Sequence, residues 1–161
     1  MYVPYHTLPD TARVWIYQSN RKFTEQEQLK VGEMATDFVE QWTRHGENVK
    51  GSFTILYDQF LIIAVDQSFV EVSGCSIDAS VKLVQQIQVQ FKVDMLNKLA
   101  VAYKQENEVL ISPMNEFASL AKENKITSNT LVFNNMVNTK KGVETQWEVS
   151  AKESWHARYF N

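Results

Sequence analysis

Apolar and polar residues follow one another along this chain with two different periods, and the changes of period divide it into strands and helices. The stretch 13–17 is rich in β-branched and aromatic residues and predicts a first strand. Thr24 and Glu27 then fit a capping box, and the apolar residues after them recur at helical spacing. We therefore expect a helix over about 24–43, which His45-Gly46 brings to an end.

Two further strands are expected at 51–57 and 60–65, with a tight hairpin turn at Asp58 and Gln59 between them. Every residue of the second strand is apolar, whereas a strand with one solvated face alternates apolar and polar residues. This pattern is typical of a central strand that is covered on both faces.

The stretch Ser73–Asp78 leads from this apolar strand into a second helical pattern that continues to Phe91. We expect Ser76 to be the N-cap of this helix, and Asp78 suits the positive end of the helix dipole. The later pattern predicts a strand pair at 99–103 and 108–111. A short helix follows, with Ser112 as N-cap and Pro113 as its first residue, and it runs through Ala121. After it we expect a strand at 130–133, a helix over about 136–147 and an irregular aromatic tail.

This order of elements predicts a single α+β domain over 1–161. Its core, at about 12–112, runs strand, helix, strand, strand, helix, strand, which is the ferredoxin-like βαββαβ order with an added hairpin strand. Right-handed crossovers then place the strands in the spatial order 4-1-3-2. Both crossover helices lie on one face, so the other face needs a cover. We expect that cover from the C-terminal helical segment at about 113–161, or from a second copy in a homodimer.

The same topology predicts which reactive or ligand-binding side chains lie close together. Strands 1 and 2 run antiparallel to strand 3, so the end of strand 3 shares an edge with the starts of the other two. Cys75 follows that end, His45 precedes strand 2, and Arg13 opens strand 1. We expect Cys75, His45 and Arg13 at one edge, beside a helix N-terminus.

Two kinds of site are open at this edge. Backbone N–H groups of the turn, with Ser73, Gly74, Cys75 and Ser76, could hold a small anion together with Arg13 and His45. Alternatively, the helix dipole could favour the Cys75 thiolate, which would act as a nucleophile with His45 or His156 as base. The simpler interpretation is a small thiol packed under a helix start, because free cysteine is often buried.

Composition narrows the function further. The 161 residues carry a formal charge of −3, which argues against nucleic-acid binding, and a single cysteine suggests a reducing compartment. We see no secretory signal and no apolar run long enough to span a membrane, so we expect a soluble cytoplasmic protein. No metal-ligand spacing and no glycine-rich cofactor motif occurs, so no metal and no cofactor are expected.

The aromatic tail around Trp155 and His156 allows two interpretations. Its rings could close the free sheet face, or they could form, with Arg158, an exposed patch for a protein partner.

Several stretches suggest a family: Val3-Pro4, Leu8–Asp10, Ala12–Gln18, Phe38–Trp42, Ser73–Asp78 and Ser154–Arg158. With them the chain resembles, over nearly its whole length, a family of small uncharacterised bacterial proteins often labelled "ABC transporter ATPase". The resemblance implies no catalytic residues. The sequence has no G-x-x-x-x-G-K-[ST] phosphate loop, so ATPase activity is not expected. We expect a binding or accessory domain for a small anion or a protein partner at the Cys75 edge, with a thiol-dependent enzyme as the alternative.

Overall fold

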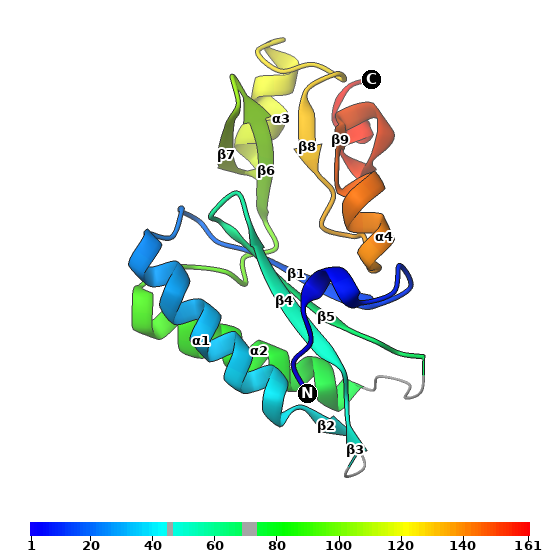
Figure 1. Cartoon of the computed structure of the whole chain (residues 1–161). Coiled ribbons are helices and arrows are strands. Elements are labelled where there is room, and N and C mark those ends of the chain that lie inside the picture. The colour runs from blue at the N-terminus through cyan, green and yellow to red at the C-terminus, as the bar shows by residue number, and fades with distance from the viewer. Residues whose placement is uncertain (45–46, 69–73) are drawn as a thin grey trace. The chain divides into compact units, whose positions relative to one another are not determined.

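The structure is a computed structural model of the 161-residue chain, and it describes all residues except 45–46 and 69–73. Of residues 43–44 and 74–77 it describes the backbone alone. The protein is a mixed α+β protein, and its chain forms two compact units (Figure 1). The first unit comprises Met1–Leu96 and Asn138–Lys141, and the second comprises Asn97–Val137 and Gly142–Asn161.

The first unit is built on an antiparallel sheet in the order β1-β5-β4. Its strands are β1 (Arg13–Gln18), β4 (Gly51–Leu56) and β5 (Phe60–Val65). Every residue of β5 is buried, as the apolar run predicts for a central strand. A short hairpin of β2 (Thr43–Arg44) and β3 (Glu47–Asn48) lies between α1 and β4 in the chain.

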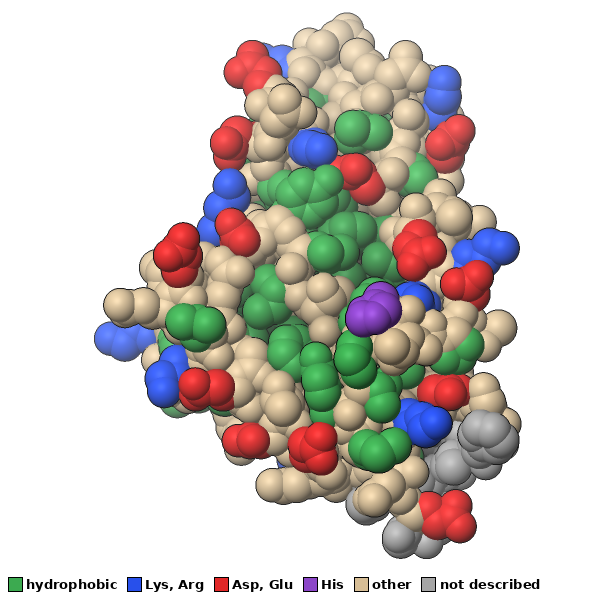
Figure 2. All heavy atoms as spheres, viewed as in Figure 1, with side chains coloured by type: hydrophobic (Ala, Val, Ile, Leu, Met, Phe, Trp, Pro, Cys, Tyr) green, Lys and Arg blue, Asp and Glu red, His purple; other side chains and the backbone are tan. Residues whose placement is uncertain are grey.

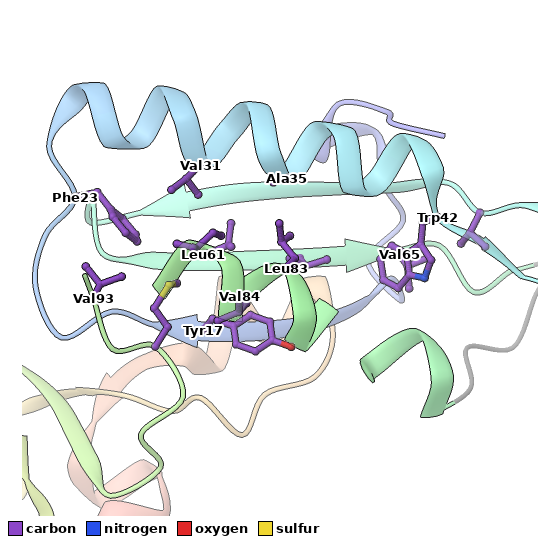
Figure 3. Close-up of a cluster of buried hydrophobic side chains, with 14 residues drawn as sticks. Tyr17, Phe23, Val31, Ala35, Trp42, Leu61, Val65, Leu83, Val84 and Val93 are labelled. Carbon is purple, nitrogen blue, oxygen red and sulfur yellow. The ribbon is translucent and has the colours of Figure 1, made fainter. Parts of the chain in front are cut away.

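Two helices, α1 (Glu25–Gln41) and α2 (Gly74–Phe91), pack on one face of this sheet. Figure 3 shows their apolar side chains meeting those of β1 and β5, with Val31, Leu61 and Val84 near the middle of the cluster. The predicted capping box is confirmed, because the Thr24 side chain accepts from the Glu27 N–H and the Glu27 carboxylate accepts from the Thr24 N–H. An Arg21 guanidinium at 2.8 Å holds the pKa of Glu27 down at about 2.

The turn between β4 and β5 is a tight hairpin, as predicted, but it lies one residue earlier than Asp58 and Gln59 and places two residues in the left-handed region. Tyr57 has φ 54° and Asp58 has φ 56°, and the Gln59 N–H donates to the Leu56 carbonyl over 3.1 Å. Two positive φ values in succession match the type I′ turn, whose second central position favours glycine.

We expect Asp58→Gly to raise the free energy of unfolding by about 0.5 kcal/mol, because glycine adopts a positive φ without strain while losing more chain entropy on folding. The Asp58 carbonyl, which accepts from the Phe23 N–H, belongs to the backbone and is kept. Urea denaturation would measure the change, with Asp58→Ala as the matched control. A variant with alanine that is as stable as the one with glycine would contradict the strain argument.

The second unit has an antiparallel sheet in the order β7-β6-β8-β9. Its elements are β6 (Ala100–Gln105), β7 (Glu108–Pro113), α3 (Met114–Lys122), β8 (Leu131–Phe133) and β9 (Glu148–Ser150). Short helical turns complete the chain: η1 (Tyr5–Thr7), α4 (Lys140–Gly142), η2 (Val143–Trp147), η3 (Ala151–Glu153) and η4 (Trp155–Tyr159). The core of this unit forms around Phe117 of α3.

The predicted ferredoxin-like topology is not confirmed. The order β1-β5-β4 matches three of its strands, but the fourth was expected beside β1, and β6 pairs with β7 and β8. A physical reason lies at the edge of β1. The Val14 N–H donates to the Asn138 carbonyl, and the Lys140 N–H donates to the Ala12 carbonyl, so the segment 138–141 occupies the place of the fourth strand.

Three local predictions are also corrected. The helix α2 begins at Gly74, so Ser76 lies within its first turn and Asp78 lies beyond that turn. The N-cap of α3 is Pro113, and Ser112 lies one position before it in β7, where its hydroxyl pairs with the Tyr103 hydroxyl at 3.2 Å. The helix expected over about 136–147 is limited to α4 and η2, and β9 follows it. The single-domain organisation, with a core at about 12–112 and a cover at about 113–161, stays a prediction.

Candidate functional site

The predicted Cys75 edge lies partly outside the described residues. Ser73 and His45 are among the residues that the structure does not describe, and of Gly74, Cys75 and Ser76 it gives only the backbone, as the first residues of α2. The surroundings of the Cys75 thiol and its distance from His45 therefore stay predictions.

The sheet register does support one part of that prediction. Arg13 of β1 and Gly51 of β4 both pair with Val65, the last residue of β5. The starts of β1 and β4 thus share an edge with the end of β5, as expected. The Arg13 guanidinium carbon lies 5.5 Å from the centre of the Trp15 ring, so this cation is positioned over an aromatic face.

His156, the alternative base for Cys75, belongs to the second unit and is fully buried there. Its Nδ1 lies 2.6 Å from the Ser154 hydroxyl, and its ring stacks on Trp155 with 3.7 Å between centroids. Burial, and then the Arg158 charge, lower the pKa of His156 to about 4, so the ring is neutral at pH 7. Among the described residues its Nε2 has no hydrogen-bond partner. This arrangement fits a histidine that packs as an aromatic ring.

A third place in the fold, the outer edge of β4, was not among the predicted sites. The Gly51 N–H donates to the Met1 carbonyl over 3.0 Å, and the Gly51 carbonyl accepts from the Val3 N–H over 2.9 Å. Tyr2 thereby forms a parallel bridge with Gly51, and the first residues of the chain add a short strand to the sheet. After Val3 the chain turns at Pro4 into η1.

Beyond Gly51 the Tyr2 ring packs beside Phe53, with 6.0 Å between centroids, but no described strand pairs with this part of the edge. In an antiparallel ladder, residues bonded to the neighbouring strand alternate with residues whose N–H and C=O point outward. Because the backbone N–H and C=O groups of Gly51 point outward, those of Phe53 and Ile55 do so as well, and those of Thr54 face β5. Within the part of the chain that the structure describes, the outward N–H and C=O groups of Phe53 and Ile55 have no hydrogen-bond partner. An unpaired edge of this kind can accept another extended chain.

A groove runs beside this open edge, between β4 and α1. It has a volume of about 590 Å³ and is lined by Phe53 from the strand and by Gln28, Leu29, Gly32, Glu33, Thr36 and Asp37 from the helix. Gly32 has no side chain to fill the groove, and a Cβ atom at that position would lie 3.7 Å from the Phe53 ring. Leu29, which is 69% exposed, adds a large apolar side chain to the lining of the groove.

The rim of the groove on α1 is acidic. Glu33, Asp37 and Glu40 are four and three residues apart, so they follow one side of the helix, and we call them the acidic stripe. Figure 2 shows the corresponding face, with acidic side chains along α1 next to apolar side chains over β4. The last carboxylate of the stripe, Glu40, already accepts the Tyr2 N–H over 3.0 Å. The stripe therefore lies along the path on which the N-terminal residues join the sheet.

Part of this site can be predicted from the sequence. The sequence of the predicted helix shows the spacing of the acidic stripe, and it places Leu29 on the polar side of that helix. The strand order was also needed, because β4 had to be recognised as an edge strand whose outward groups begin at Gly51 and continue at Phe53.

Some kinds of site find no support in the described part of the chain. There, no group of three or more His, Cys, Asp or Glu side chains could hold a metal ion. No described helix is both long and apolar enough to cross a membrane.

Comparisons with known proteins add no family. No protein-family model, no curated protein and no solved structure matches this chain. The resemblance to proteins labelled "ABC transporter ATPase" therefore stays a prediction, and the functional argument depends on the geometry of the chain itself.

Proposed function

We propose that this protein is a binding or accessory protein that takes up an extended segment of a protein partner along β4. One observation carries the proposal: the outward backbone groups of Phe53 and Ile55 are unpaired, directly after a stretch where Met1–Val3 pair with Gly51. The pairing of the chain's own residues Met1–Val3 with Gly51 supports this mode of binding by strand addition. Main-chain hydrogen bonds would give affinity, and the groove beside Phe53 would receive alternate side chains of the bound segment.

The proposal is tested by selecting random extended peptides displayed on phage against the intact chain. We expect selected peptides to bind at least about tenfold more weakly to Ile55→Pro, because proline removes an outward donor. Proline is tolerated at an edge position whose N–H faces solvent, so the ladder between β4 and β5 is kept. The variant Ile55→Val, which keeps the donor, is the matched control for packing. Failure to enrich any peptide, or equal binding to Ile55→Pro, would contradict the proposal.

A small anion bound at the Cys75 edge is a second proposal, supported by Arg13 at the shared edge of β1 and β5 and by the start of α2 at Gly74. A thiol-dependent reaction of Cys75 is its alternative. A shift of melting temperature with phosphate or sulfate would favour the anion. Alkylation of the thiol well below its reference pKa of about 8.5 would favour the enzyme. A cytoplasmic location is part of both proposals.

A further inference from the structure

Resting on the function proposed above, we infer that the segment bound along β4 is basic, with cationic side chains two positions apart that face Glu33 and Asp37. The spacings of the two elements support this match. Residues two apart on a strand lie about 6.7 Å apart on the same face, and residues four apart on a helix rise by about 6 Å. Alternate side chains of a segment paired with β4 would therefore meet successive carboxylates of the acidic stripe.

The side of the strand is set by the packing of β4. Phe53 and Ile55 both pack against the core cluster beneath α1 and α2, so their side chains lie on the helix side of the sheet. In a paired strand, residues directly opposite share a face. Side chains opposite Phe53 and Ile55 would then extend over the groove toward α1, whereas those between them would extend to the other side.

Two of the three carboxylates in the stripe are available to a partner. Both Glu33 and Asp37 are exposed. The cation nearest in the sequence, Lys30, lies 3.3 Å from Glu33 in a pair whose side chains are 61% and 67% exposed. Such a pair is weak and can exchange for a partner's cation. The third carboxylate, Glu40, accepts the Tyr2 N–H.

The same stripe argues against a second copy of this chain as the occupant. If two β4 edges paired around a twofold axis, the sheet would become continuous and both α1 helices would lie on one face of it. The acidic stripes of the two copies would then approach each other, and like charges in an interface oppose association. A basic segment would instead be attracted by the carboxylates of the stripe, so the partner that fits this edge is basic.

The test uses the full chain and three short acetylated and amidated peptides, in which threonine alternates with lysine, glutamine or glutamate. Binding is followed by amide chemical shifts of β4. We expect the lysine peptide to bind about tenfold more tightly than the glutamine peptide, and to lose this advantage at high salt. In the double variant Glu33→Gln and Asp37→Asn, the lysine peptide should fall to the affinity of the glutamine peptide. The matched control, Glu116→Gln with Glu144→Gln, removes the same charge from the second unit and should leave the preference unchanged.

Equal binding of the lysine and glutamine peptides would overturn the inference and leave the proposed function standing. A lysine preference that survives in the double variant, or that disappears in the control variant, would overturn it as well, because the charge would act from elsewhere. If none of the three peptides binds, the inference fails and the stripe is a guard against edge-to-edge aggregation, while the phage selection decides the proposed function separately. Dimerisation seen by sedimentation, and abolished by Ile55→Pro, would identify a second copy as the occupant and overturn the inference.

Discussion

Replacing Phe117 by alanine is expected to lower the free energy of unfolding by about 3–5 kcal/mol, the range for deleting a large aromatic side chain from a packed core. Phe117 is completely buried in the second unit. Four aromatic rings meet it edge-on at centroid distances of 5.4 to 6.1 Å, from Tyr103, His156, Tyr159 and Phe160. Three of these rings come from the C-terminal tail, so the side chain joins that tail to α3 and β6.

The measurement is urea denaturation followed by circular dichroism and tryptophan fluorescence. Met136→Ala is the matched control, because Met136 belongs to the same unit and is 76% exposed, so its loss should change stability by less than about 0.5 kcal/mol. A loss below about 1 kcal/mol for Phe117→Ala would contradict the central place of this ring in the core.

Lowering the pH from 6.5 to 4 is expected to destabilise the protein through His156 by up to about 3 kcal/mol. The pKa of His156 falls from 6.5 to about 4 in the folded protein, chiefly because the ring is buried. Between these two values the unfolded chain binds a proton that the folded chain does not bind. The protein therefore keeps its full stability above pH 6.5 and loses stability as the pH falls. Below pH 4 the whole contribution of the neutral His156 ring to the free energy of unfolding is lost.

The profile is measured by thermal unfolding across this pH range, with His156→Phe expected to flatten it. His6→Gln, which removes an exposed histidine of the first unit, is the control. Glu27, whose pKa falls from 4.5 to about 2, contributes in a lower window, which meets that of His156 only between about pH 4 and 4.5. Should His156→Phe fail to fold, the titration of the His156 ring protons by NMR gives the pKa directly. A value near 6.5, or a flat profile in the unmodified protein, would contradict the buried neutral ring.

Local elements could be predicted from the sequence where a short-range pattern determines them. The capping box at Thr24, the apolar run of β5 and the hairpin turn after Leu56 each depend on neighbouring residues alone, and each is present. The partner of β6 depends on which distant segment occupies the edge of β1. Nothing in the pattern of residues 138–141 indicates that its backbone takes this place.

The same distinction applies to the candidate sites. The Cys75 loop could be proposed from the sequence because thiol and hydroxyl side chains have known reactivity. The β4 edge consists mostly of backbone groups, which are the same for nearly every residue type and so cannot be recognised from composition. His156 was a candidate base as an isolated residue. Its neutral state follows from rings that fold around it, Trp155 from beside it and Phe117 from another element.

The most direct test of binding along β4 is the exchange of its backbone amide hydrogens, measured by NMR in the free protein and with the lysine peptide at saturation. In the free protein the amides of Phe53 and Ile55 should exchange much faster than that of Thr54, because only the Thr54 N–H faces β5. With the peptide bound, the slow exchange should extend to Phe53 and Ile55. Equal protection of all three amides in the free protein, or unchanged exchange at Phe53 and Ile55 in the complex, would contradict an open edge that takes up an extended chain.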